Sequence, residues 1–244
     1  MTMLSGLVRG LIDIIYPNTC VVCKTNIKNK TTIDNLICVA CWRKIKKNLP
    51  PFCHCCGRHL KKTNFSKGVC SDCIRKKLHF DRAFSPCAYE GVIKELIHEF
   101  KYKNKDYLGS TLCKLLIEFI KEYNFPIEFV DLIVPIPLHK TKLREREFNQ
   151  SEALSTQLAL EFKKVLASDV LLRSRYLKTQ TDLEVNERLL NVKDSFSVTK
   201  EEYIKDRNIL LVDDVLTSGA TTSEAAFVLK RAGARIVFVL TLAN

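Results

Sequence analysis

Residues 209–222 read Ile-Leu-Leu-Val-Asp-Asp-Val-Leu-Thr-Ser-Gly-Ala-Thr-Thr. The first four form a continuous apolar run with the length of a buried strand. Downstream, apolar residues at helical spacing predict a helix that ends near Gly233, and residues 236–242 predict another strand. The helix positions are Ala225, Ala226, Val228, Leu229 and Ala232. This order of strand, loop, helix and strand indicates an α/β fold with a parallel sheet covered on both faces.

The loop between the strand and the helix has the composition of a phosphate site. Hydroxyl side chains and a glycine at a helix N-terminus offer hydroxyl and backbone N–H donors to a phosphate. These residues are Thr217, Ser218, Gly219 and Thr221. Asp213 and Asp214 stand at the carboxyl end of the strand, where α/β sheets bind ligands. Because carboxylates repel phosphate, we expect them to hold sugar hydroxyls or a phosphate-bound metal. The loop is neither a Walker A loop nor a dinucleotide fingerprint.

Positive charge and cysteine are both concentrated in the first third of the chain. Residues 1–84 hold 16 Lys and Arg against four Asp and Glu, whereas residues 85–244 hold 23 of each. Nine of the eleven cysteines precede residue 85. We therefore expect two domains, residues 1–84 and 85–244. The basic balance of the first favours a polyanionic partner such as nucleic acid.

Eight cysteines form four Cys-x-x-Cys pairs, Cys20/Cys23, Cys38/Cys41, Cys53/Cys56 and Cys70/Cys73. The first and third pairs are offset by 33 residues, and the second and fourth by 32. This repeat indicates a duplicated ribbon with one tetrahedral, structural zinc site in each half. An interleaved arrangement, first pair with third and second with fourth, is the alternative. Disulfides are disfavoured in a reducing cytoplasm. Cys55, His54 and His59 are neighbouring residues that could substitute as ligands.

Two zinc–thiolate centres would lower the charge of the first domain from +12 to +8, so basic clusters persist. Their members are Lys44, Lys46, Lys47, Lys61, Lys62, Arg75, Lys76 and Lys77. Trp42, Phe52 and Phe65 either stack on bases or form the small core of the ribbons, and we favour core. Contact with single-stranded DNA through this domain is a hypothesis.

The N-terminal residues have helical periodicity. Apolar positions at Leu4, Leu7, Val8, Leu11, Ile12 and Ile15 predict an amphipathic helix that packs against the protein. No run of about 18 apolar residues predicts a transmembrane helix, and no cleavage site of a secretory signal follows. We expect a cytoplasmic protein.

Residues 211–221, Leu-Val-Asp-Asp-Val-Leu-Thr-Ser-Gly-Ala-Thr, resemble the phosphoribosyl pyrophosphate (PRPP) loop of type I phosphoribosyltransferases. With paired zinc ribbons before it, the chain resembles the ComF (competence protein F) family from about Pro17 to Leu242. Residues 134–138 and 144–150 are similar to the family's strand, pyrophosphate loop and helix start. The start of the family's transferase domain is matched by Tyr89, Glu90, Gly91, Leu96, Ile97 and Lys101. The family's mobile loop is matched by Gln180, Leu183, Arg188, Asn191 and Phe196.

The resemblance implies a type I phosphoribosyltransferase-like parallel sheet with helices on both faces, preceded by a small zinc-ribbon domain. It implies a PRPP site made of Asp213, Asp214, Val215, Leu216, Thr217, Ser218, Gly219, Ala220 and Thr221. The aspartates would accept hydrogen bonds from the ribose hydroxyls, and Mg²⁺ would bind together with PRPP. Arg144, Arg146 and Arg188 would neutralise the pyrophosphate. Glu147 replaces the family's usual glycine, and its side chain and charge should weaken pyrophosphate binding or alter the turn.

For function, the resemblance implies a PRPP-binding protein of natural transformation that handles incoming single-stranded DNA. One alternative is an active phosphoribosyltransferase of nucleotide metabolism with an unidentified acceptor. Another is a non-catalytic adaptor whose zinc ribbons dock a DNA-uptake partner such as a helicase.

Overall fold

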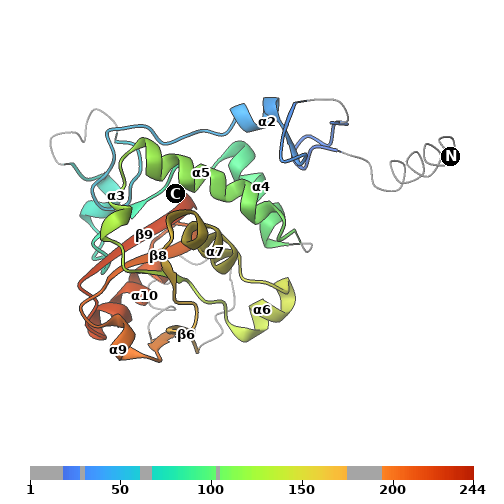
Figure 1. Cartoon of the computed structure of the whole chain (residues 1–244). Helices are drawn as coiled ribbons and strands as arrows, with labels where there is room; N and C mark the ends of the chain where they lie inside the picture. Colours follow the sequence, from blue (N-terminus) through green and yellow to red (C-terminus); the bar gives the residue numbers. More distant parts are fainter. Residues whose placement is uncertain (1–18, 28–30, 61–67, 103–104, 175–193) are drawn as a thin grey trace.

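The computed structural model describes residues 19–27, 31–60, 68–102, 105–174 and 194–244. Its main sheet has five parallel strands in the order β3–β9–β8–β4–β5 (Figure 1). They span Arg82–Phe84 (β3), Leu132–Pro135 (β4), Val165–Leu166 (β5), Asn208–Val215 (β8) and Ile236–Ala243 (β9). The α/β fold with a parallel sheet is therefore confirmed.

Both faces of the sheet are covered, because successive side chains of β8 enter different cores. Leu210 and Val212 share a core with the helices before β8 in the chain. Ile209 and Leu211 share the other core with the helix that follows β8. Burial on both sides explains why the strand is a continuous apolar run and does not alternate with polar residues.

The helices are α4 (Gly91–Lys101), α5 (Leu108–Glu122), α6 (Lys140–Arg146), α7 (Gln150–Phe162), α9 (Glu201–Ile204) and α10 (Ala220–Arg231), with a short 3-10 helix η2 at Ile127–Phe129. A separate antiparallel pair joins β6 (Leu171–Arg173) to β7 (Phe196–Val198). The predicted C-terminal strand–loop–helix–strand unit is confirmed as β8, α10 and β9. One difference is that β8 runs on through both aspartates to Val215.

The edge strand β3 comes from the segment that joins the cysteine-rich part to the rest of the chain. Its residues pair in parallel with Phe238–Leu240 of β9. After β3, Cys87 forms isolated β-bridges with both Lys47 and Ala243, so backbone pairing joins this segment to the ribbon and to β9. The domain division at residue 84 stays a prediction, and the three residues before it contribute backbone hydrogen bonds to the sheet.

The cysteine-rich part consists of short elements. In the first half, β1 (Thr32–Ile33) pairs antiparallel with β2 (Ile37–Cys38), and α2 (Val39–Arg43) follows. The second half carries α3 (Ser71–Ile74). Figure 1 shows α2 and α3 at separate places. The two halves contact different surfaces, because Asp34 of the first bonds with Thr111 of α5 and Lys76 of the second bonds with Ser218.

Several predicted features lie outside the described residues. They are the amphipathic helix of residues 4–15, Lys61, Lys62, Phe65, and residues 180–191 with Arg188. Within the described ranges, no helix combines the length and the apolar character needed to cross a membrane.

Candidate functional site

The eight paired cysteines gather into two groups of four. Cys20, Cys23, Cys38 and Cys41 form one, and Cys53, Cys56, Cys70 and Cys73 form the other. Within each group all sulfur atoms lie within 4.8 Å of one another. Consecutive pairs therefore converge, and the interleaved alternative is wrong. Neither Cys55 nor His54 or His59 belongs to a group.

The sulfur positions fit zinc and exclude disulfides. Four sulfurs bound tetrahedrally to zinc at 2.3 Å lie about 3.8 Å apart. Cys23 Sγ lies 3.8 Å from Cys38 Sγ, and Cys56 Sγ lies 3.7 Å from Cys70 Sγ. A disulfide would bring the sulfurs to about 2.05 Å, and all eleven cysteines are free. Four thiolates at this spacing form the donor set of a closed structural zinc site.

The duplication is reproduced in local geometry. The amide of Cys38 donates to Sγ of Cys20 at 3.4 Å, and the amide of Cys70 donates to Sγ of Cys53 at 3.3 Å. Each of these amides belongs to the residue directly before a short helix, α2 or α3. The same thiolate-stabilising bond therefore recurs in both ribbons.

At the carboxyl end of β8, Asp213 and Asp214 form a closely coupled pair. Oδ1 of Asp213 accepts hydrogen bonds from the Ser151 hydroxyl (3.0 Å) and from the Asp214 amide (2.9 Å). Asp214 is buried, and its Oδ2 lies 3.0 Å from Nζ of Lys101. Burial, together with the charge of Asp214, raises the pKa of Asp213 to about 7. The pair can accept hydrogen bonds from a diol, and its protonation changes near neutrality.

Two helices bring partners to this pair. Lys101 is the last residue of α4; burial lowers its pKa, but attraction to Asp214 outweighs burial and the pKa is raised. Ser151 lies in the first turn of α7, whose N-terminus is capped by Asn149. The Asn149 side chain accepts from the Ser151 amide (3.1 Å) and donates to the Ile136 carbonyl (3.1 Å), which ties α7 to the end of β4. The cap therefore fixes the donor that faces Asp213.

The loop after β8 leaves backbone donors open at the start of α10. Among the described residues, the amides of Thr217, Ser218 and Gly219 donate to no protein acceptor. Gly219 has φ 81°, a left-handed conformation that glycine adopts without strain. The Ser218 hydroxyl accepts from the Ala220 amide at 3.3 Å. Open N–H groups at the positive end of a 12-residue helix are donors that can bind a phosphate group.

Buried arginine and glutamine donors without acceptors lie near the aspartates. Arg146 Nη1 donates to Oε1 of Gln150 at 3.0 Å. Within the described part, Nε of Arg146, Nε2 of Gln150 and Nε of Arg173 are buried without a partner. Burial lowers the pKa of Arg173, while the charge of Asp213 opposes this shift and that of Arg146 adds to it. Each unsatisfied donor costs about 1–3 kcal/mol, and an anionic ligand would supply the missing acceptors.

The predicted pyrophosphate arginines have different environments. Arg146 is half-buried, with its guanidinium 5.5 Å from the Tyr102 ring centre. Arg144 is exposed on α6, and within the described part of the chain it has no hydrogen bond or ion pair with Asp213 or Asp214. Arg188 lies outside the described ranges.

Glu147 ends α6 in a left-handed conformation with φ 66°. Its amide donates to the Leu143 carbonyl at 2.7 Å. Glycine adopts this conformation without strain, whereas a side chain adds steric cost. The turn therefore keeps the shape expected of a glycine, and it carries an exposed carboxylate beside Arg146.

The sequence by itself assigns no individual role to Lys101, Ser151, Gln150 or Arg173. Ser151 had a detectable signal, because Asn149 two residues earlier is a typical N-cap. Lys101 entered only through the family resemblance. No local pattern predicts Arg173, which stands at the end of a three-residue strand and reaches the site only through tertiary packing.

The predicted basic cluster of the first ribbon is partly neutralised. Lys46 Nζ lies 2.6 Å from Glu90 Oε1, and Lys47 Nζ lies 3.2 Å from Glu118 Oε2. Lys44 is exposed and has no ion pair within the described ranges. Two of these three lysines therefore bind the α/β domain and are less available to a polyanion.

Of the aromatic residues singled out in the ribbons, the two that the structure describes, Trp42 and Phe52, pack as core. The Phe52 ring makes edge contacts with Phe119 at 5.7 Å and with Tyr123 at 5.1 Å between ring centres. Trp42 is partly buried against the same core. These contacts favour the core interpretation over a base-stacking surface.

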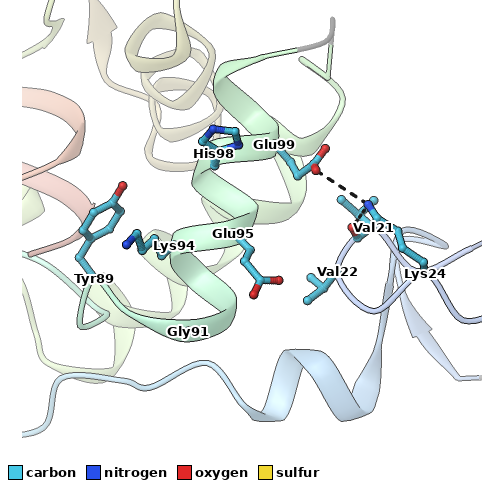
Figure 2. Close-up of a pocket in the computed structure, with 9 residues that line it drawn as sticks. All are labelled: Val21, Val22, Lys24, Tyr89, Gly91, Lys94, Glu95, His98 and Glu99. Atoms are coloured by element: carbon cyan, nitrogen blue, oxygen red, sulfur yellow. Dashed lines mark hydrogen bonds and ion pairs between the residues drawn. The ribbon is translucent and has the colours of Figure 1, made fainter. Parts of the chain in front are cut away.

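A cavity of about 560 Å³ lies between the first ribbon and α4 (Figure 2). Its walls include Val21, Val22 and Lys24 from the ribbon, and Lys94, Glu95, His98 and Glu99 from the helix. Lys24 Nζ lies 3.8 Å from Glu99 Oε1, so an ion pair joins the two walls. Neither Asp213 nor Asp214 lines this cavity, which is separate from the site at β8.

Two family models match the chain. A double zinc ribbon domain matches residues 11–74, and a phosphoribosyl transferase domain matches residues 149–244. Together with the geometry, they confirm the zinc ribbons and the type I phosphoribosyltransferase-like fold. The ribbon match also supports zinc as the metal of the two cysteine groups.

Curated relatives match most of the chain. Competence protein F of Haemophilus influenzae is 28% identical over 229 residues, which cover 92% of this chain and 96% of the relative. The DNA utilization protein YhgH of Escherichia coli is 30% identical over 210 residues, covering 84% and 89%. Competence protein ComFC of Bacillus subtilis is 31% identical over 200 residues, covering 79% and 77%.

Proposed function

The chain belongs to the ComF family of competence and DNA-utilization proteins, and we propose that it binds PRPP and acts in natural transformation, in the handling of incoming single-stranded DNA. One observation carries the PRPP part of this proposal. Open loop amides, two carboxylates and unpartnered arginine donors meet around one end of β8. They match the phosphate, the ribose diol and the pyrophosphate of a single ligand.

Each part of the site has a distinct proposed role. The amides and hydroxyls of residues 217–221 bind the 5-phosphate. Asp213 and Asp214 accept hydrogen bonds from the ribose 2- and 3-hydroxyls. Arg146 and Arg173 neutralise the pyrophosphate, with Arg144 and Arg188 as further predicted contributors. Ser151 and Lys101 position the two carboxylates and need not touch the ligand.

Magnesium is proposed to bind together with PRPP. Carboxylate and phosphate oxygens are the ligands that Mg²⁺ prefers, and it is held by few protein groups plus substrate phosphates. The two aspartates offer such oxygens, although Lys101 already occupies Oδ2 of Asp214. When bound, Mg²⁺ would supply charge neutralisation to the pyrophosphate.

If the protein catalyses transfer, its residues need not form a covalent bond with the substrate. As pyrophosphate leaves, the anomeric carbon becomes electron-poor, so the residues act by orienting groups, stabilising charge and excluding water. A phosphoribosyltransferase fold by itself does not establish turnover. Turnover with an acceptor is therefore an outcome of the test.

Calorimetric titration of the zinc-loaded protein with Mg-PRPP tests the proposal, beside an Asp213→Asn/Asp214→Asn variant with unchanged zinc content. We expect saturable binding to the wild type and its loss in the variant. Pyrophosphate release would be assayed on the same samples with a panel of bases and nucleotides. Folded, zinc-loaded wild-type protein that fails to bind Mg-PRPP would overturn the proposal.

The DNA part of the proposal is supported by the relatives' names and by the basic balance of residues 1–84. Exposed lysines of the ribbons would contact the phosphate backbone. A cytoplasmic location is proposed because reduced thiols are needed for two thiolate zinc sites. A helicase that docks on the ribbons stays a prediction.

A further inference from the structure

The second ribbon lies directly against the phosphate loop. Lys76, three residues after Cys73, donates from Nζ to the Ser218 carbonyl at 3.2 Å. Leu78 packs on the same loop, since a Cβ placed on Gly219 would lie 3.3 Å from Leu78 Cδ2. The ribbon therefore holds the loop through one hydrogen bond and one close apolar contact.

The contact continues onto α10 and the C-terminus. Both the amide and Nδ1 of His79 lie 3.1 Å from Oγ of Ser223, in the first turn of α10. Asn244 donates from its side chain to the carbonyl of Cys56, a predicted zinc ligand, at 2.7 Å. The first turn of α10 and the residue that follows β9 are thus both connected to the second ribbon.

Very little space separates the loop from the metal site. Cys56 and Cys73 line the same gap as Thr217 and Ser218, and the gap measures about 20 Å³. That volume holds about one water molecule. The second cysteine group also shares a hydrophobic core with the residues that flank the loop, Leu216 and Ala220.

The first ribbon docks elsewhere. Asp34 accepts from Thr111 Oγ1 at 2.7 Å and pairs with Lys114 at 2.5 Å, both on α5, and Lys24 pairs with Glu99 on α4 (Figure 2). These contacts lead to α4 and α5 and not to the loop at residues 216–219.

The duplication supplies an internal reference for Lys76. Lys44 follows Cys41 by the same three residues, and its amide donates to the Cys41 carbonyl at 3.0 Å. The Lys76 amide does the same to Cys73 at 3.2 Å. The two lysines therefore share a local backbone and differ in what the side chain touches.

This inference rests on the proposed PRPP site. We propose that the second zinc ribbon takes part in forming that site. Lys76, Leu78 and His79 hold the loop and the first turn of α10 in the phosphate-binding conformation. Zinc at the second cysteine group and the phosphoribosyl ligand then stabilise one another, whereas zinc at the first group does not take part. Lys76 is a positioning residue, because its ammonium binds the loop carbonyl.

Ligand affinity gives the first test, with Mg-PRPP and ribose 5-phosphate as probes. Lys76→Met removes a charged donor from a backbone carbonyl, and we expect both probes to bind about tenfold more weakly. Lys44→Met should stay within about twofold of the wild type. Lys76→Arg keeps a donor and should recover part of the loss, which a general packing role would not predict.

Zinc retention gives a second test that needs no activity. We expect Cys41→Ser to retain only the second zinc and Cys73→Ser only the first, which the zinc content of each variant checks. Because coupling between two binding sites is reciprocal, saturating ribose 5-phosphate should make the remaining zinc of Cys41→Ser harder for a chromophoric chelator to extract. The zinc of Cys73→Ser should be extracted equally with and without the sugar phosphate.

The failure of this inference can be distinguished from the failure of the proposed function. If the wild type binds neither probe, the proposed PRPP site is wrong. If the wild type binds but Lys76→Met and Lys44→Met behave alike, the PRPP site stands and the coupling to the second ribbon is wrong. Ligand protection of the zinc in Cys73→Ser would also overturn the coupling.

Discussion

Lys101 Nζ and Asp214 Oδ2 lie 3.0 Å apart and join the last residue of α4 to the end of β8. Because both side chains are largely buried, removing the lysine would leave a carboxylate without its counter-charge beside Asp213. Breaking such a pair costs up to about 3–5 kcal/mol. We expect Lys101→Met to lower the free energy of unfolding by about 2 kcal/mol at pH 7.5, measured by urea unfolding. The loss is below the full range because some solvent still reaches the pair.

The control is the double variant Lys101→Met/Asp214→Asn, which removes both charges and should recover much of the loss. The raised pKa of Lys101 means that its stabilisation is complete at neutral pH and is lost only as pH rises beyond its folded-state pKa, above 10.5. Additive effects of the two single changes would show that the pair is not coupled.

The pKa of Asp213 near 7 predicts a pH-dependent affinity for PRPP. Ribose hydroxyls and Mg²⁺ favour the carboxylate form, so binding should release a proton when the pH is at or below 7. Affinity should fall as the pH drops from 8 to 6. Calorimetry at pH 6.5 in two buffers of different ionisation enthalpy measures the protons released.

PRPP also titrates in this range, so Asp213→Asn provides the reference. Its proton release should be smaller than that of the wild type by up to one proton. An identical release in both proteins would assign the titration to the ligand. In the free protein, the raised pKa of Asp213 means that its neutral carboxyl contributes fully to folding stability below pH 4. This contribution is lost as the pH rises towards 7.

Arg173 should contribute to binding pyrophosphate. Its Nε is buried without a partner, and it lies within electrostatic reach of Asp213. A charged hydrogen bond contributes about 1.5–3 kcal/mol, so Arg173→Met should weaken Mg-PRPP binding about ten- to 100-fold. Ribose 5-phosphate lacks the pyrophosphate and should bind with nearly unchanged affinity. The exposed Arg144, changed to Met, is the matched control with a smaller expected loss.

Glu147→Gly should increase both stability and affinity. The left-handed conformation costs a residue with a side chain about 1–2 kcal/mol, of which glycine's extra chain entropy offsets about 0.5–1. A net gain of about 0.5–1 kcal/mol in the free energy of unfolding is expected. Removing the carboxylate should also strengthen Mg-PRPP binding by about two- to fivefold.

Lys163→Gly is the reference for this change. Lys163 ends α7 in the same left-handed conformation with φ 52°. It should gain similar stability with unchanged PRPP affinity. Equal affinity gains in both variants would trace the effect to the backbone and not to the charge.

Single-stranded DNA binding should depend more on Lys44 than on its paired neighbours. Each phosphate contact contributes about 0.7 to the slope of log affinity against log salt for single strands. Lys44→Glu should therefore reduce that slope, measured with a labelled oligothymidylate by anisotropy. Lys46→Glu should reduce it less, because Glu90 already neutralises Lys46. An unchanged slope for Lys44→Glu would remove the first ribbon from the DNA contact.

The parts predictable from sequence are those encoded within short stretches. The apolar run before Asp213 and the hydroxyl-rich turn after Asp214 predict a strand and a loop without reference to the remaining chain. Cysteine spacing likewise predicts two ribbons, because each zinc site is closed by residues about 20 apart. In these stretches local chemistry and final structure coincide.

The unpredicted parts depend on packing between distant segments. Lys101 and Arg173 reach the aspartates from elements about 70 residues apart in the chain, and neither carries a local pattern. The ion pairs of Lys46 and Lys47 with α/β-domain glutamates are equally nonlocal, so a cluster that counts as basic in sequence is partly neutral in space.

The edge strand β3 limits how this protein can be divided or recombined. A polypeptide beginning at residue 85 would keep β9 but lose the backbone partners of Phe238–Leu240. An apolar strand with an open edge recruits strands from other molecules and aggregates. Exchange of ribbons between relatives is therefore expected to yield soluble hybrids only when the junction lies before Arg82. Arg82, Ala83 and Phe84 therefore have to stay with the sheet wherever the chain is divided.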